Sequence, residues 1–265
     1  MTSVENFARL DRYLRKQIDT VSGYLIPIDA LAISALGKFQ TGKGIRGGLC
    51  EFGVHHGRLF FILAHLRRHG EKVLACDLFE DGAGNDNRIH RGRATAIFRN
   101  IKRLGIDIAD DEILIGNTLE LKPENITSRI GNPRLVSVDA GHLYNEVAND
   151  LALSAAILAP EGVIIADDYF NLYWPDVTTA TNAFLENSDG AFAPFLITPG
   201  KLYICRSEYL PVYREYLQQL TASPSVRSRS AELNKRTITA IRLSRRGEWQ
   251  HRLRGMLPGR GKNSI

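Results

Sequence analysis

Residues 48–58 of the chain read Gly-Leu-Cys-Glu-Phe-Gly-Val-His-His-Gly-Arg. The short apolar run Leu49–Phe52 stops at Gly53, and after Gly57 the chain enters the apolar, helix-like segment Leu59–Leu66. A strand, a glycine turn and a helix N-terminus in this order form the ligand cradle of open α/β sheets. We therefore expect the first strand of such a sheet here, with a ligand at its turn.

Further apolar runs with strand character follow at 72–77, 112–116, 134–139 and 163–168. Segments with helical spacing separate them, and we expect helices over 88–104, 123–129, 143–158 and 176–186. This alternation predicts the α/β class with a doubly wound, mostly parallel sheet. Two more runs, 193–198 and 201–205, meet at Pro199-Gly200 and predict an antiparallel hairpin at the end of the sheet.

The pattern divides the chain into three parts. Residues 1–40 contain two helical stretches and are expected to form a lid, residues 41–208 carry the sheet, and 38–48 read as a loop. For residues 209–265 we expect a helix over 211–220, a linker rich in serine and arginine, and a basic, partly disordered end. Arg242, Arg245, Arg246, Arg252 and Arg254 are expected on one short helix.

Residues 37–44 match the spacing of a nucleotide-binding P-loop up to its last position. Gly44 stands where a P-loop needs serine or threonine to bind magnesium. The segment also leads into a strand, whereas a P-loop follows one and opens a helix. We therefore interpret it as a flexible loop and not as a nucleoside triphosphate site.

The composition is that of an ordinary globular protein, with 44% hydrophobic and 24% charged residues in 265. No apolar run is long enough for a membrane span, and the first residues show no secretory pattern, so we expect a cytoplasmic protein. Cys50, Cys76 and Cys205 are widely spaced, which indicates free thiols and argues against a zinc site.

The net charge of +5 is unevenly distributed. Residues 223–265 hold 11 lysines and arginines against two acidic residues, so the remainder of the chain is acidic. The basic end could contact anionic lipid or nucleic acid, or it could only improve solubility. No aromatic residues alternate with the basic ones in a recognition motif, so both interpretations stay open.

Ligands of open α/β sheets gather at the carboxyl ends of the strands. The turn after the first strand lacks the central glycine of the dinucleotide motif, which disfavours close approach of a pyrophosphate. Asp77 ends the second strand, where an acid can accept hydrogen bonds from ribose hydroxyls. A ligand with an adenosine and no pyrophosphate, such as S-adenosylmethionine, fits these features. A solvated acid beside a plain turn is the alternative.

The expected fourth and fifth strands also end on acids, Asp139 and the pair Asp167-Asp168. Three carboxylates in one cleft repel unless a cation or protons intervene, and oxygen ligands favour magnesium, calcium or manganese. His142 lies at the mouth of the same cleft and is a candidate base for a substrate hydroxyl, or only a helix cap. Glu51, inside an apolar strand, needs a partner in the turn, in the ligand or in a basic side chain.

Residues 51–58 resemble the first motif of class I S-adenosylmethionine-dependent methyltransferases. Residues 138–144, together with 149–151, 160–162 and 167–169, resemble the metal-dependent branch of that class. This branch includes macrolide-sugar and aminocoumarin O-methyltransferases and cephalosporin-hydroxylase-like proteins. The resemblance covers about residues 20–206, and it implies a Rossmann-like fold.

The resemblance also implies roles for single residues. Acids matching Asp139, Asp167 and Asp168 would bind magnesium, and the acid matching Asp77 would bind the cofactor ribose. Ala140 and Asn117 depart from the branch, which has glycine and often aspartate there. The residues expected to bind the cofactor are Glu51, Gly53, His56, Gly57, Asp77, Asn117 and Asp139.

Together these observations predict a magnesium-assisted O-methyltransferase with His142 and Asp139 as catalytic residues. A hydroxyl of a sugar or another small natural product is the expected acceptor, on resemblance alone, and a homo-oligomer is compatible with the sequence. The alternatives are a protein that binds a nucleoside-like ligand without catalysis and a nucleic-acid methyltransferase that uses the basic end. The acidic body of the chain disfavours the latter.

Overall fold

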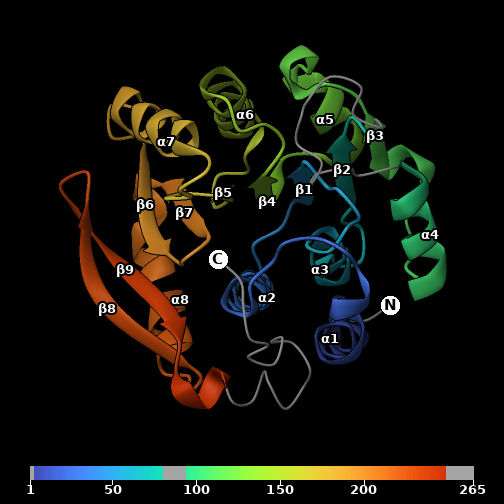
Figure 1. Ribbon diagram of the computed structural model, residues 1–265, viewed down its shortest axis with the longest axis horizontal. Helices are drawn as coiled ribbons and strands as arrows, with labels where there is room; N and C mark the ends of the chain where they lie inside the picture. Colours follow the sequence, from blue (N-terminus) through green and yellow to red (C-terminus); the bar gives the residue numbers. More distant parts are fainter. Residues whose placement is uncertain (1–2, 80–93, 249–265) are drawn as a thin grey trace.

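The computed structural model describes residues 3–79 and 94–248, which build three layers around one sheet (Figure 1). Nine strands lie in the order β3-β2-β1-β4-β5-β7-β6-β9-β8. Their bounds are β1 Gly48–Phe52, β2 Val73–Asp77, β3 Ile113–Ile115, β4 Pro133–Val138, β5 Val163–Asp167, β6 Phe192–Ile197, β7 Lys201–Arg206, β8 Val226–Leu233 and β9 Arg236–Leu243.

Strands β1 to β5 pair in parallel, and β7 pairs antiparallel with both β5 and β6. The doubly wound α/β fold, mostly parallel with an antiparallel hairpin, is thereby confirmed. The apolar runs are continuous because helices cover both faces of these central strands. The buried strand β7 lies next to β5 in the sheet and runs antiparallel to it.

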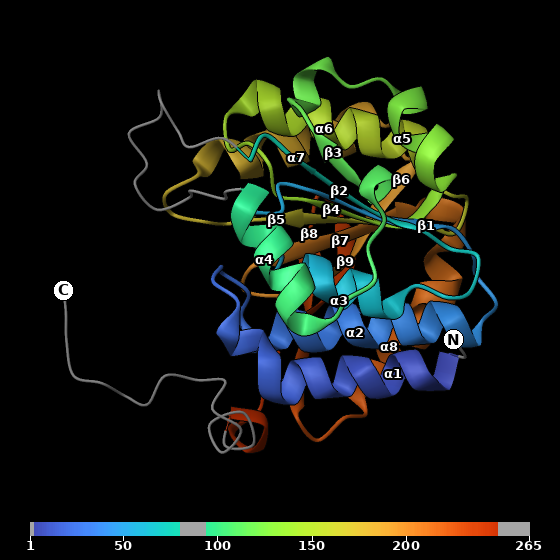
Figure 2. The same ribbon diagram turned by 90° about the vertical axis from the view of Figure 1, so that its right-hand side faces the viewer.

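Helices pack on both faces of the sheet, as the edge-on view shows (Figure 2). One face carries α1 Ser3–Arg12, α2 Pro27–Gly42, α3 Phe60–Leu66, α4 Ala94–Leu104 and α8 Leu210–Thr221. The other carries α5 Pro123–Ile130, α6 Tyr144–Ile157 and α7 Pro175–Asn187. The alternation of side chains along β1 serves both cores, with Leu49 on the first face and Cys50 and Phe52 on the second.

The predicted loop over 38–48 is wrong in its first half, because α2 continues to Gly42. The reason is tertiary: Phe39 is buried in the core, and the Gln40 amide donates a 3.0 Å hydrogen bond to the carbonyl of Arg134. Burial of these side chains outweighs the glycines, which only weaken a helix. The segment that imitates a P-loop is therefore largely helical.

The predicted linker after residue 223 is also wrong, because β8 and β9 form a hairpin there. Residues 196–197 of β6 pair in parallel with 239–240 of β9, and Ile238 and Ile241 are buried. Asn234 and Lys235 form the turn with φ values of 48° and 60°, as a two-residue hairpin requires.

The five arginines expected on one short helix are separated. Arg242 lies in β9, whereas Arg245 and Arg246 begin a helical turn. Arg252, Arg254 and the expected disordered end 258–265 lie outside the described residues, as do residues 80–93. Among the described residues, no helix has the length and apolar character that a membrane span needs.

Candidate active site

The parallel order of β1, β2, β4 and β5 brings their carboxyl ends to one edge of the sheet (Figure 1). Backbone hydrogen bonds join these ends: the nitrogen of Gly53 donates to the Cys76 carbonyl and that of Asp139 to the Phe52 carbonyl, both at 2.8 Å. The predicted cofactor turn and the predicted catalytic acid are thus direct neighbours.

Glycine is required at both ends of the turn. Gly53 has a φ of 79°, and a Cβ atom there would lie 1.9 Å from the Asp139 carbonyl oxygen. Gly57 has a φ of 91°, and its Cβ would lie 2.6 Å from the Phe61 ring. His55, which stands between them, takes the left-handed region at 51° without being glycine. The backbone at position 55 therefore takes a conformation that favours glycine, although the residue there is a histidine.

The carboxylate of Asp77 binds this turn directly. Its Oδ2 atom accepts hydrogen bonds from the backbone nitrogens of Val54 at 2.6 Å and His55 at 2.8 Å, and Oδ1 accepts one from Phe79. Each carboxylate oxygen has two acceptor positions, so these bonds leave capacity for a ligand hydroxyl. The role of Asp77 at a ribose stays a prediction.

Glu51 is 2% exposed, and its Oε2 atom has no hydrogen-bond partner among the described residues. Burial raises its pKa well above the usual range, and Lys201 opposes this shift. A buried polar atom without a partner is costly unless a ligand or water satisfies it. The cradle thus fits a ligand that carries a hydrogen-bond donor, such as the amino group of S-adenosylmethionine.

The loop before α2 is tied to the turn through Arg58. This arginine forms a 2.6 Å ion pair with Asp19 and donates hydrogen bonds to the carbonyls of Val21 and Gly23. Sequence reasoning missed Arg58, whose only signal was its place directly after the second glycine. The N-terminal segment therefore borders the cofactor cradle, and its role as a lid stays a prediction.

His56 and Asn117 take part in contacts outside the acidic group. The rings of His55 and His56 stack at 4.0 Å, and the carbonyl of His56 accepts a bond from Asn100. The Asn117 side chain accepts a 3.0 Å bond from the nitrogen of Leu119 and so caps the short helix after β3. These contacts give each residue a local role, and no described contact tests their roles as cofactor ligands.

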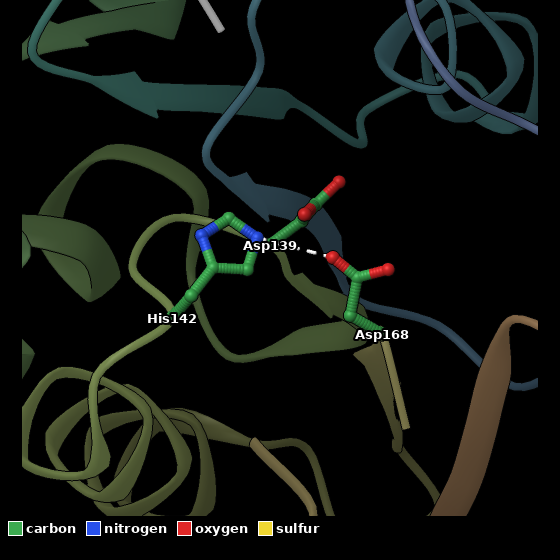
Figure 3. Close-up of side chains that lie close together, drawn as sticks. All are labelled: Asp139, His142 and Asp168. Atoms are coloured by element: carbon green, nitrogen blue, oxygen red, sulfur yellow. Dashed lines mark hydrogen bonds and ion pairs between the residues drawn. The ribbon is translucent and has the colours of Figure 1, made fainter. Parts of the chain in front are cut away.

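Asp139, His142 and Asp168 form the acidic part of the site (Figure 3). One ligand atom from each lies within 4.8 Å of the others, and the Nε2 atom of His142 lies 3.1 Å from Oδ2 of Asp168. The ring of Trp174 stacks on His142 with centroids 4.4 Å apart and fixes its orientation. Two carboxylates and an imidazole at this spacing can hold a divalent cation.

The environment sets the charge of the two acids in opposite ways. Burial raises the pKa of Asp139 well above its usual value, and the neighbouring Asp167 and Asp168 add to the rise, which Lys201 opposes. Burial would also raise the pKa of Asp168, but hydrogen bonds from His142 and Asn171 outweigh it and hold the pKa below normal. Asp139 is repelled by the neighbouring carboxylates of Asp167 and Asp168, and a bound cation would relieve this repulsion.

Asp167, the third predicted metal ligand, lines the same cleft and lies beside Asp139. Its Oδ2 atom forms a 2.5 Å ion pair with the ammonium of Lys201, which is 1% exposed. Sequence reasoning missed Lys201; the only signal was a lysine at the start of an otherwise apolar run. The structure thus brings Asp139, His142 and Asp168 together, and it pairs Asp167 with a cation of the protein itself.

Comparison with known proteins agrees with this geometry. A family model described as a methyltransferase domain matches residues 50–169, which run from β1 through β5. This part of the chain is similar to a methyltransferase domain. The class I S-adenosylmethionine-dependent methyltransferase suggested by the sequence, and its assignment as an enzyme, are thereby confirmed. A comparison with curated proteins found no match.

Solved structures show the same fold. The O-methyltransferase NovP aligns with a TM-score of 0.54 at 22% identity, over 66% of this chain and 78% of NovP. The calicheamicin methyltransferase CalS11 aligns with a TM-score of 0.50 at 16% identity, over 77% of this chain and 91% of CalS11. At these identities the likeness concerns the fold, so the acceptor and the metal must be argued from the site itself.

Proposed function

We propose that this methyltransferase is an O-methyltransferase that modifies a hydroxyl of a small acceptor, assisted by a divalent cation. The observation that carries the proposal is the contact between the two halves of the site. A Cβ on Gly53, in the cofactor turn, would collide with the backbone of Asp139, which belongs to the acidic group. A methyl donor in the turn and a hydroxyl at Asp139 would therefore be adjacent, as an in-line transfer requires.

The residues of the chain supply binding and orientation. The glycine turn, with Asp77 and the unpartnered Glu51 oxygen, would hold S-adenosylmethionine, which supplies the methyl group. Asp139 and Asp168 would hold the cation, whose charge lowers the pKa of a bound hydroxyl. The proton would leave to a carboxylate at the mouth of the cleft, or to the imidazole of His142 if that imidazole does not bind the cation.

A rim of exposed apolar side chains beside the acidic group bears on the acceptor. Phe170, Leu172 and Tyr173 lie two to five residues after Asp168 and are 64%, 85% and 80% exposed. Large apolar residues exposed together mark a binding surface. NovP is an O-methyltransferase and CalS11 is a calicheamicin methyltransferase. For this chain, an acceptor with a sugar or ring and an apolar part suits the rim.

Two measurements test the proposal. Calorimetry is expected to show binding of S-adenosylmethionine, and a screen of hydroxylated sugars and natural products is expected to show release of S-adenosylhomocysteine in the presence of a divalent cation. Transfer that is equally fast in a chelator would remove the cation from the proposal. Transfer to nitrogen or carbon acceptors only would contradict the O-methyltransferase assignment.

A further inference from the structure

Lys201 is a buried cation beside the proposed metal group. It opens β7, and the antiparallel register pairs it with Asp167 at the end of β5. Its ammonium lies 2.5 Å from Oδ2 of Asp167, and its pKa is raised because Asp167, Asp139 and Asp29 outweigh the effect of burial. The sheet itself thus fixes a positive charge at the position of the third predicted metal ligand.

Both oxygens of Asp167 are engaged within the chain. Oδ2 binds Lys201, and Oδ1 accepts a 2.8 Å hydrogen bond from the backbone nitrogen of Asp168. A carboxylate in a buried ion pair gives up its partner at a large cost, since the partner charge would be left uncompensated. Asp167 is therefore a poor candidate for direct contact with a second cation.

The acids that face Lys201 strengthen this arrangement. Asp29 and Glu51 are each 2% exposed, and both act on Lys201 or are acted on by it. Burial raises the pKa of Asp29 to about 7, with Lys201 and a hydrogen bond to Thr198 opposing the rise. Lys201 thus lies near several acids. In a variant in which only Asp167 is neutral, the other acids still interact with the Lys201 ammonium.

On the proposed metal-assisted function, we infer that the cation is held by Asp139, His142 and Asp168, and that Lys201 is a positioning residue that keeps Asp167 out of the coordination sphere. The third ligand is then an imidazole nitrogen and not a carboxylate oxygen. Magnesium, calcium and manganese all bind oxygen ligands, but an imidazole nitrogen adds affinity only for the first-row transition ions, whose series begins with manganese. The site therefore prefers manganese to magnesium.

The contacts around His142 suit a ligand role. Trp174 stacks on the ring, and the Nε2 atom points toward Asp168 (Figure 3). Asp168 itself has a left-handed φ of 53° and accepts a 2.8 Å bond from the side chain of Asn171. Strained backbone that is held by its surroundings is typical of functional positions. The geometry thus presents an imidazole and a carboxylate as a fixed pair.

Electron paramagnetic resonance of manganese measures binding without any acceptor, because bound Mn²⁺ loses the signal of the free aqua ion. We expect the full-length protein to bind one Mn²⁺ and Mg²⁺ to displace it only at tenfold or greater excess. Asp168→Asn and His142→Asn should each weaken Mn²⁺ binding at least tenfold, and His142→Asn should also reduce the Mn²⁺/Mg²⁺ preference. Asp167→Asn should change Mn²⁺ affinity less than threefold.

Equal losses in Asp167→Asn and Asp168→Asn would overturn the inference, as would a His142→Asn protein with unchanged affinity and preference. Lys201→Met should free Asp167 and raise Mg²⁺ affinity, and the added Asp167→Asn substitution should remove this gain. If Lys201→Met does not fold by circular dichroism, Asp167→Asn decides, because Lys201 then keeps Asp139 and Asp29 nearby.

Calorimetry with S-adenosylmethionine separates this inference from the proposed function. A protein that binds S-adenosylmethionine but no Mn²⁺ refutes the metal site alone and leaves the methyltransferase intact. A protein that binds Mn²⁺ through Asp139, His142 and Asp168, yet methylates no hydroxyl, supports the inference and counts against the O-methyltransferase proposal.

Discussion

The Oδ2 atom of Asp77 accepts a 2.8 Å hydrogen bond from the backbone nitrogen of His55, whose φ of 51° lies in the left-handed region. The acid at the end of β2 thus holds the turn after β1 in its binding shape. Position 55 is where a glycine would be free of strain, since a Cβ in this region costs about 1–2 kcal/mol.

A pair of variants at His55 tests whether the turn depends on backbone shape and not on the imidazole. His55→Gly should change the free energy of unfolding by less than about 1 kcal/mol, because the relief of strain offsets the added chain entropy. His55→Val should lose about 1–2 kcal/mol, since a β-branched residue resists this φ. Urea unfolding measures both, and equal effects would contradict the argument.

The carboxylate of Asp77 is expected to serve both the turn and the cofactor. Asp77→Ala removes the acceptor of three backbone nitrogens and should weaken S-adenosylmethionine binding more than tenfold in calorimetry. Asp77→Asn keeps one acceptor oxygen and should lose less stability than the alanine variant. The control Asp111→Ala removes an exposed pair with Lys72 and should leave affinity unchanged. Unchanged affinity in Asp77→Ala would remove it from the cofactor site.

The sequence predicted the central sheet because its strands are buried on both faces and read as continuous apolar runs. The rule that ligands gather at strand ends also predicts from the sequence alone that Gly53, Asp77 and Asp139 lie at one edge of the sheet. The hairpin β8–β9 escaped prediction because β8 is an edge strand with exposed Arg227 and Arg229, a composition typical of a linker.

Lys201 could not be predicted from sequence because its role depends on pairing across the sheet. Only the antiparallel register of β5 and β7 puts it opposite Asp167. The end of α2 depended in the same way on tertiary contacts of Gln40 with Arg134 and Tyr213. Local sequence patterns predict the strands and the acids at their ends. They do not predict which side chains from distant parts of the chain lie in contact, because that depends on the tertiary fold.

A buried charge network at the other end of the sheet should dominate stability. Glu71 accepts hydrogen bonds from Arg68 and from Arg134, which is fully buried. Glu71→Gln would leave buried arginines short of negative charge and should cost about 3–5 kcal/mol in urea unfolding. The matched control Glu215→Gln breaks the exposed pair with Lys43 and should cost less than about 1 kcal/mol. Similar costs would contradict the network's importance.

The pKa of Glu71 gives the sign of its pH dependence. Burial would raise it, but hydrogen bonds and charge from Arg68 and Arg134 outweigh burial and lower it below the ordinary 4.5. The unfolded chain therefore binds the proton more readily, so the stabilisation is present above pH 4.5 and is lost as the pH falls through the folded value. Glu71→Gln should remove this part of the acid sensitivity.

His65 should make the protein less stable in mild acid. Burial, with the charges of Arg9 and Arg67, lowers its pKa from 6.5 to about 4. The unfolded state then binds more protons between these values, so stability should fall as the pH drops from 6.5 toward 4. His65→Gln, which cannot titrate there, should show a flatter stability profile over this range. If the free energy of unfolding of His65→Gln, measured with urea, depends on pH between 4.5 and 7 as it does in the unchanged protein, the assignment is refuted.

The β8–β9 hairpin should be part of the cooperative fold and not an appendage. Ile241 is 4% exposed and packs in the core beneath α2 and α8, and neighbouring residues of β9 pair with β6. Ile241→Ala should therefore cost about 2–5 kcal/mol, since it leaves a cavity in a packed interior. Arg242→Ala, at the next, exposed position, should change stability by less than about 0.5 kcal/mol. Thermal unfolding followed at the far-ultraviolet circular dichroism of the whole chain distinguishes the two cases, because an independent hairpin would melt without lowering the main transition.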